Sequence, residues 1–277
     1  MGFLQSLAAA RDAGYVLTPA EMRAVDRHAI ESLGIPGVAL MENAARHVAA
    51  FAARCTRRGG RIGVVCGGGN NGGDGLAAAR HLAAWGFDVE VVRLETGRLS
   101  GDAETHLRVV DALGLAVRTV DDMASVATLP APGHYQTLVD AVLGTGLRGP
   151  VTGGARELLS WINGHGATVV AVDVPSGLCG RTGRPLGTAV RAQQTVTFGA
   201  SKTGHWLHPG PEYVGALHVV DIGLPPGLVA AHAGGRVVLG DAALARASAP
   251  RRLDDHKGRL GHLWVLAGSP GRSGAAR

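Results

Sequence analysis

The feature that most constrains the fold is a glycine-rich segment between an apolar strand and a helix. Residues 61–66 read RIGVVC, which predicts a buried strand, and residues 76–85 have the composition of a helix that ends before Gly86. Between them, residues 67–75 read GGGNNGGDG, and six of these nine are glycine. Glycine permits backbone conformations and close ligand approaches that other residues exclude. We therefore predict a loop that holds an anion, such as a phosphate, at the N-terminus of the helix.

Two other interpretations of this segment exist. One is a tight turn without a ligand, although two asparagines and an aspartate are more oxygen-bearing side chains than a turn requires. The other is a redox dinucleotide enzyme, because G-x-G-x-x-G occurs at Gly67, Gly69 and Gly72 and an acidic residue, Glu95, follows the next strand. That pattern alone is a weak fingerprint. Amide and carboxylate oxygens at this point favour a bound cation or sugar hydroxyls.

Strands alternate with helices along most of the chain. This order predicts an α/β protein: a Rossmann-like three-layer α/β/α sandwich with a mostly parallel central sheet. Besides the strand at 61–66, we expect strands at 87–94, 116–120, 136–143, 168–172, 195–198 and 216–222, and helices at 18–32, 37–58, 76–85, 101–113 and 155–163.

Two further strands end in segments with similar chemistry. The strand at 136–143 contains Asp140 and runs into a second glycine-rich loop, residues 144–150, GTGLRGP. The strand at 168–172 runs into DVPSG, which begins at Asp173. Either aspartate alone could satisfy a turn. In a parallel sheet, however, the three strand ends lie at one edge, so the three loops can form one site. Lys202, in an expected loop after residue 198, is a surface charge or a phosphate contact.

The amino-acid composition argues against two classes of partner, nucleic acids and membranes. The chain of 277 residues carries 27 Lys+Arg against 22 Asp+Glu, a net charge of +5, and the arginines are scattered rather than clustered. Nucleic-acid binders usually cluster their basic residues, so we expect no nucleic-acid partner. We also expect no membrane partner, because no apolar run is long enough to span a bilayer. The three cysteines are far apart and no charged segment precedes the first apolar residues, which predicts a cytoplasmic protein.

Three motifs in this order carry a resemblance to a known family. G-N-N-G-G-D-G at 69–75, V-D-A-x-x-G-T-G at 139–146 and D-V-P-S-G at 173–177 resemble the YjeF N-terminal domain family over about residues 15–228. That family includes the NAD(P)HX epimerases. The resemblance implies a homodimer, with the helices of residues 19–58 as interface elements. It also implies epimerisation of the R and S forms of NAD(P)HX, hydrated NAD(P)H, at C6 of the nicotinamide ring, as a step of nicotinamide nucleotide repair.

The resemblance also implies roles for individual residues. Asp173 would contact the substrate and act as the acid/base group, while inversion proceeds either through loss and return of the hydroxyl or through ring opening. Lys202 and Arg148 are weaker candidates for phosphate contacts, and Lys202 has no catalytic role in this interpretation. A potassium ion (K+) would be held by Asn71, Asp140 and Ser176, whose hard oxygen atoms suit an alkali cation. The substrate would be bound by Asn70, Asn71, Gly72, Gly73, Asp74, Gly144, Thr145, Gly146, Leu147, Arg148, Gly149, Pro150 and Asp173.

The C-terminal segment carries a second resemblance. Residues 255–262, DHKGRLGH, and 265–269, VLAGS, are similar to the opening of the ADP-dependent NAD(P)HX dehydratase domain, which is ribokinase-like. Residues 240–277 are too short for a core of their own, so we expect a truncated bifunctional protein without dehydratase activity.

An alternative to the epimerase is a non-catalytic binding module. Domains of the YjeF N-terminal type also occur in a messenger-RNA decapping scaffold and in a lipoprotein-associated binding protein.

Overall fold

A computed structural model describes residues 14–95, 97, 99 and 101–238 of the chain. The predicted dehydratase-like segment lies outside the described residues, and the predicted bounds of the epimerase-like domain, 15–228, stay a prediction. None of the described helices is long and apolar enough to cross a membrane.

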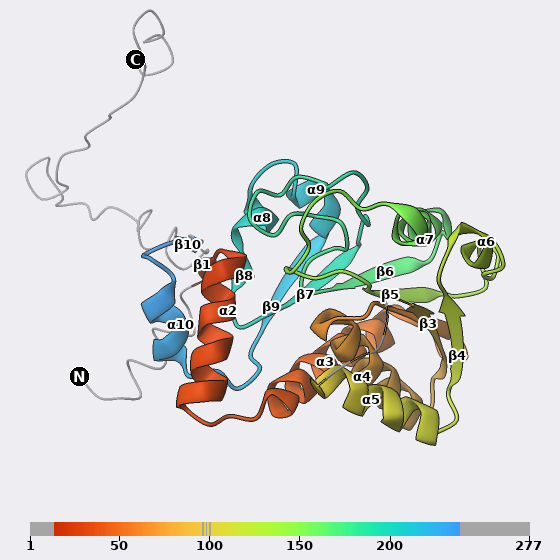
Figure 1. The fold of residues 1–277 in the computed structure, drawn as a ribbon, viewed down its shortest axis with the longest axis horizontal. Coiled ribbons are helices and arrows are strands. Elements are labelled where there is room, and N and C mark those ends of the chain that lie inside the picture. The colour runs from red at the N-terminus through yellow and green to blue at the C-terminus, as the bar shows by residue number, and fades with distance from the viewer. Residues whose placement is uncertain (1–13, 96, 98, 100, 239–277) are drawn as a thin grey trace, which may run out of the picture. The chain divides into compact units, whose positions relative to one another are not determined.

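A parallel sheet of seven strands forms the centre of the fold, in the order β4-β3-β2-β5-β6-β7-β9 (Figure 1). Every neighbouring pair in this sheet is parallel, which confirms the predicted fold class. The strands are β2 (Arg61–Cys66), β3 (Asp88–Leu94), β4 (Ala116–Val120), β5 (Thr137–Ala141), β6 (Thr168–Val172), β7 (Gln194–Phe198) and β9 (Ala216–Val220).

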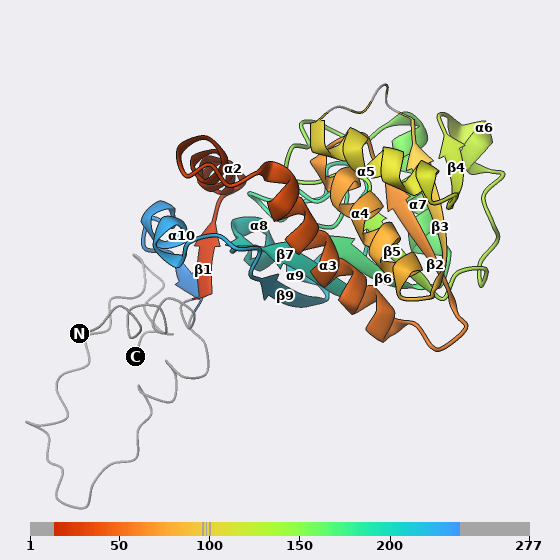
Figure 2. The ribbon, with the colours of Figure 1, turned by 90° about the horizontal axis from the view of Figure 1, so that it is seen from below.

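Helices cover both faces of this sheet, and a hydrophobic core lies between the sheet and the helices on each face. Figure 2 shows α3 (Gly37–Cys55), α4 (Asn70–Ala84) and α5 (Gly101–Ala112) side by side over one face, while α6 (Met123–Val126) and α7 (Gly153–Gly164) lie over the other. Because successive side chains of a strand point to opposite faces, Val64 belongs to the core with α3 and α4, and Val65 to the core with α7.

The sequence did not predict a second, three-stranded sheet with the order β10-β1-β8. It consists of β1 (Gly14–Leu17), β8 (Ser201–Lys202) and β10 (Val237–Val238). The prediction that Lys202 lies in a loop is therefore wrong, because this residue lies in β8 and pairs with Leu17 of β1. Because β1, the strand that pairs with β8, lies far away along the chain, the residues around Lys202 carry no local sequence signal of this pairing. The remaining helices are α2 (Pro19–Arg27), the π-helix η1 (His28–Ser32), α8 (Thr203–Trp206), α9 (Pro211–Val214) and α10 (Pro226–His232).

The strand order reverses beside β2. From β2 the chain continues outwards through β3 and β4, and it then returns to β5 on the other side of β2 and continues through β6, β7 and β9. Open parallel sheets bind ligands outside the carboxyl ends of the strands at such a switch point. The two glycine-rich segments follow β2 and β5, so the topology brings both of them to this point.

The helix after β2 begins six residues earlier than the sequence predicts. α4 starts at Asn70 rather than Leu76, and only residues 67–69 form the connection. The glycines near the start of α4 are tolerated because this helix packs closely on the sheet: a Cβ atom on Gly75 would lie 2.6 Å from Cβ of Ala141 and 2.8 Å from Sγ of Cys66. Tertiary packing here outweighs the poor helix propensity of glycine.

Candidate active site

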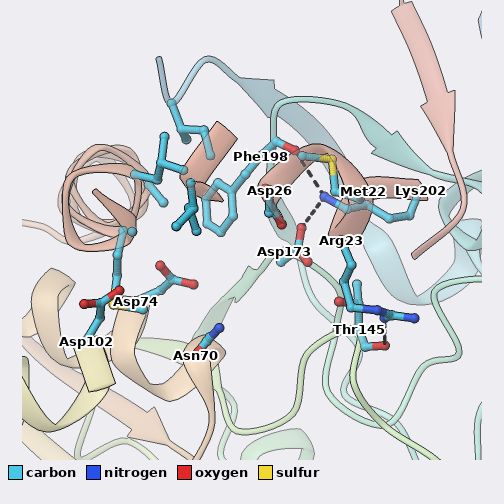
Figure 3. A pocket seen from close by; sticks show the side chains of 16 residues that line it. Met22, Arg23, Asp26, Asn70, Asp74, Asp102, Thr145, Asp173, Phe198 and Lys202 are labelled. Atoms are coloured by element: carbon cyan, nitrogen blue, oxygen red, sulfur yellow. Dashed lines mark hydrogen bonds and ion pairs between the residues drawn. The ribbon is translucent and has the colours of Figure 1, made fainter. Parts of the chain in front are cut away.

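A pocket of about 160 Å³ lies at the carboxyl ends of the central strands (Figure 3). Four of the predicted substrate residues line it: Asn70, Asp74, Thr145 and Asp173. Its other lining residues are Met22, Arg23, Asp26, Ile30, Gly37, Leu40, Met41, Ala44, Asp102, Phe198, Lys202 and Ile222. The pocket thus combines an apolar wall, which suits a ring, with several carboxyl groups.

Asp173 forms a buried ion pair at the end of β6. Its Oδ1 atom accepts hydrogen bonds from Nζ of Lys202 at 2.5 Å and from Oγ1 of Thr197 at 2.8 Å. Burial by itself would raise the pKa of Asp173, but the charge and hydrogen bond of Lys202, together with Thr197, lower it below its usual value. The carboxyl group is therefore ionised at neutral pH. Its backbone has a φ of 63°, which is rare outside glycine and marks a position held by its surroundings.

Lys202 is buried, and all three of its ammonium hydrogens are used within the protein. Besides Asp173, Nζ donates to Oγ1 of Thr197 at 2.8 Å and to the carbonyl oxygen of Phe198 at 3.2 Å. Its side chain is only 1% exposed. The expectation that Lys202 is a surface charge is therefore wrong. Its ammonium group also has no hydrogen left for the phosphate contact that was the other expectation. No pattern in the sequence predicted that Lys202 keeps the carboxyl group of Asp173 ionised.

His205 holds the two partners of this ion pair together. Its Nδ1 atom accepts the backbone N–H of Lys202 at 3.1 Å, so its Nε2–H group donates to the backbone carbonyl of Asp173, also at 3.1 Å. Burial lowers the pKa of His205 to about 4, with a further contribution from Lys202, so the ring stays neutral. A neutral imidazole bridge explains how the left-handed backbone of Asp173 is maintained.

Two further carboxyl groups in the pocket have raised pKa values. Burial raises the pKa of Asp74 well above its usual value, and the negative charges of Asp173 and Asp26 add to this effect. Burial raises the pKa of Asp26 to about 6; Lys202 opposes this shift and Asp173 adds to it. The sequence missed Asp26, and the only local signal is its position one helical turn after Met22, a buried residue of α2.

The three predicted potassium ligands are not among the residues that line the pocket. Oγ of Ser176 donates to Oδ1 of Asp140 at 2.5 Å, and the backbone N–H of Ser176 donates to Oδ2 at 2.8 Å. Burial raises the pKa of Asp140 to about 6, and the hydrogen bonds from Ser176 oppose the shift. Among the described residues, Nδ2 of Asn71 is buried without a hydrogen-bond partner. Asn71 lies against Gly144, in the loop that follows Asp140.

Of the predicted substrate residues in the two glycine-rich segments, only some reach the pocket. Thr145 lines it, and its carbonyl oxygen accepts a hydrogen bond from Nη1 of Arg23 at 3.3 Å. Gly146 and residues 148–150 are exposed, whereas Gly72 and Gly73 are buried in the first turn of α4. Their contacts with a substrate stay a prediction.

For steric reasons, any side chain at position 72 is expected to lower the stability of the fold. A Cβ atom at this position would lie 1.9 Å from the carbonyl oxygen of Gly67, whereas a Cβ atom on Gly69 would meet nothing within 4 Å. We expect Gly72→Ala to lower the free energy of unfolding by about 1–3 kcal/mol, as overpacking does, and Gly69→Ala to change it by less than about 0.5 kcal/mol. Urea unfolding of both variants measures the difference, and equal stability of the two would show that this steric account is wrong.

Comparison with known proteins gives consistent matches. Residues 37–204 match the family described as "YjeF-related protein N-terminus". Over 263 residues the chain is 41% identical to the "Bifunctional NAD(P)H-hydrate repair enzyme Nnr" of Thermofilum pendens, an alignment that covers 92% of this chain and 48% of that protein. The chain thus spans about half the length of this relative. Over 210 residues it is 35% identical to the "NAD(P)H-hydrate epimerase" of Rhodopirellula baltica, covering 76% of this chain and 84% of that protein.

A solved structure supports the fold alone. The crystal structure of the yeast protein ynu0 (YNL200c) is similar with a TM-score of 0.60 and 22% sequence identity, over 68% of this chain and 82% of that one.

Proposed function

Since this chain belongs to the YjeF-related N-terminal family, we propose that it is an epimerase that interconverts the R and S forms of hydrated NAD(P)H at C6 of the nicotinamide ring. The observation that carries the proposal is the ionised Asp173, held by Lys202 in a pocket that also contains carboxyl groups of raised pKa. Environments that push the pKa values of neighbouring acids apart are typical of acid–base sites. The relative named NAD(P)H-hydrate epimerase covers most of the chain and supports the same reaction.

The charge of Asp173 favours one of the two routes to inversion. Loss of the C6 hydroxyl leaves a cation that the adjacent ring nitrogen shares, and an ionised carboxylate stabilises such a cation. When water returns on the other face of the ring, it becomes a strong acid as it bonds to C6, so even a weak base can take its proton. Ring opening would instead require a base able to deprotonate a neutral hydroxyl, and the lowered pKa of Asp173 makes it too weak. The proposed route is therefore loss and return of the hydroxyl.

The proposed binding mode places the nicotinamide end of the substrate in the pocket. Met41, Phe198 and Ile222 provide its apolar wall. Residues 70–74 and 144–150 are proposed to contact the rest of the dinucleotide, because the N-terminus of α4 presents free backbone N–H groups that suit a phosphate.

We also propose that a potassium ion binds between the two loops through Asn71, Asp140 and Ser176. The amide group of Asn71 has one end without a partner among the described residues, and a half-turn of this amide would place Oδ1 at that position. Asp140 and Ser176 add a carboxylate and a hydroxyl that are already in contact. This donor set fits a hard cation. When bound, the ion would supply positive charge that fixes the loops and offsets the charge of the substrate phosphates.

Potassium is expected to stabilise the fold as well as to support activity. At a concentration tenfold above its dissociation constant, it should raise the free energy of unfolding by about 1.4 kcal/mol. Thermal and urea unfolding in potassium chloride and in choline chloride at equal ionic strength measure this effect, and Asn71→Ala should remove it. Identical stability of the wild-type protein in both salts would contradict the proposed ion site.

A homodimer and a cytoplasmic location form a further part of this proposal. Ile30 and Leu33, in the predicted interface segment 19–58, are 42% and 50% exposed, and a second copy could cover this apolar surface. Cys55, Cys66 and Cys179 are all unpaired, as is usual in a reducing compartment. Sedimentation of the wild-type protein and of Leu33→Glu tests the dimer, which a monomeric wild type would exclude.

A coupled assay tests the proposed activity. Purified (R)-NADPHX is supplied with an S-specific dehydratase and its nucleotide, and the return of NADPH is followed with and without this protein, in potassium. Spontaneous epimerisation sets the baseline. We expect clear acceleration in proportion to the amount of protein. No acceleration by well-folded protein would favour the non-catalytic binding module.

A further inference from the structure

Asp26 is a carboxyl group in the pocket that none of the sequence motifs includes. It lies on α2, ahead of the segment that matches the family, and it lines the same cavity as Asp74 and Asp173 (Figure 3). Within the described part of the chain, no hydrogen bond or ion pair involves its side chain, and only longer-range charges act on it. A half-buried carboxyl group without a partner is costly, so its position at a pocket requires an explanation.

The position of Asp26 is fixed by the contacts of its helix rather than by contacts of its own. Thr18 and Glu21 form a capping box at the start of α2, and Glu21 also pairs with Arg236. On the same helix Met22 and Val25 are buried. α2 is therefore anchored at its start and along one side, and it presents the Asp26 carboxyl group to the pocket.

The proposed reaction lacks a proton donor. A hydroxyl leaves C6 readily only if it is protonated as it departs, and Asp173, which is ionised in the free protein, does not carry that proton when the forward reaction begins. Asp74, whose pKa burial raises well above its usual value, belongs to the residues 70–74 that are proposed to contact the rest of the dinucleotide. Asp26, with a pKa of about 6, populates both forms near neutral pH, as a group that gives and regains a proton must.

We propose that Asp26 is the general acid of the epimerisation and protonates the C6 hydroxyl as it leaves. This inference rests on the proposed function. The Asp26 carboxylic acid transfers its proton to the hydroxyl oxygen, and the C6–O bond breaks with its electron pair leaving on water. Water then adds to the opposite face of C6, and Asp173 takes the proton that this water loses. Asp173 releases that proton to solvent and Asp26 regains one, so no other reactant is consumed. In the reverse direction a protonated Asp173 gives the proton to the leaving hydroxyl, and an ionised Asp26 takes the proton of the incoming water.

The charged groups around Asp26 come from several elements. Asp173 follows β6, Lys202 lies in β8 and Asp74 lies in α4, and all three act on its pKa or line the same cavity. Arg23, on α2 itself, also lines the cavity. The remaining helix packed against α2, α10, carries His232, whose ring lies against His28. Lys202 is the only one of these that lowers the pKa of Asp26, and it is already paired with Asp173.

The test compares Asp26→Asn with Asp111→Asn, which removes an exposed carboxyl group of α5 that does not line the pocket. We expect Asp26→Asn to lower kcat by about 10²-fold or more, with KM within about threefold of the wild-type value. The wild-type rate should fall as the pH rises above about 6, the pKa of Asp26. Asp26→Asn should lose this alkaline fall, Asp26→Glu should retain it, and Asp111→Asn should match the wild type. Epimers are separated by chromatography, so that no coupling enzyme limits the pH range.

Stability measurements separate this role from a structural one. Because the carboxylate has no hydrogen-bond or ion-pair partner among the residues that the structure describes, Asp26→Asn should unfold at the same temperature as the wild type or above it at neutral pH. A variant with normal kcat and an unchanged pH profile would overturn the proposal, as would a rate loss explained entirely by a lower unfolding temperature. A wild-type protein without epimerase activity would overturn the proposed function, and the role of Asp26 with it.

Discussion

Replacing Asp173 by asparagine is expected to lower the epimerase kcat by about 10³-fold, because the variant loses both the negative charge that stabilises the cation and the base that receives the proton. The substitution keeps the size of the side chain, so the pocket should keep its shape. Direct measurement of epimer interconversion in the presence of potassium gives the rate. Asp88→Asn is the matched control, because that carboxylate is exposed and pairs with Arg61 away from the pocket.

A loss of stability must be separated from the loss of chemistry in this variant. Asparagine at position 173 leaves the buried ammonium group of Lys202 without a counter-ion, which is strongly destabilising. The double variant Asp173→Asn with Lys202→Met removes both charges and should recover most of the stability, while its kcat stays low. Activity close to that of the wild type in either variant would exclude Asp173 as the base.

Lys202→Met is expected to cause the largest loss of stability of any single substitution discussed, on the order of 3–5 kcal/mol near neutral pH. The loss arises because the carboxylate of Asp173 stays buried after its partner has been removed. Burial then outweighs the remaining hydrogen bond from Thr197, and we expect it to raise the pKa of Asp173 above the value in the unfolded chain. The variant should also be nearly inactive, since a protonated Asp173 can neither stabilise the cation nor accept a proton.

The pH dependence of this loss has a definite sign. In the wild type the folded pKa of Asp173 is lowered, so its contribution to stability is present above the unfolded pKa, near 4, and is lost as the pH falls through the folded value. In Lys202→Met the folded pKa is raised, so stability falls as the pH rises from the unfolded value to the folded one. The difference in unfolding free energy between the two proteins should therefore grow as the pH increases from below 4 to neutrality. Urea unfolding over that range measures it, and a constant difference would contradict the ion-pair account.

The sequence was sufficient for the central sheet because its strands carry local signals. Apolar runs such as residues 61–66 and 168–172 end at glycine or aspartate, and a helix-like segment separates each strand from the next. The rule that parallel strands end at one edge then predicted that Asp173 and the glycine-rich segment would meet, and both line the pocket.

What the sequence did not predict depends on contacts between distant segments. β1, β8 and β10 are strands of two to four residues that exist only because they pair with one another across the domain. Lys202 was therefore misplaced in a loop, and its pairing with Asp173 was missed. Asp26 has the appearance of an ordinary helix charge, and only the packing of α2 against the pocket shows otherwise.

The most direct test of the proposed epimerase is to start from each pure epimer of hydrated NADPH and follow both by proton NMR, without a dehydratase, in potassium. The account predicts that the two samples reach the same R-to-S ratio, at a rate proportional to the amount of protein and well above the spontaneous rate, and that no NADPH forms. If the two epimers interconvert only at the spontaneous rate in the presence of folded protein, the domain is not an epimerase.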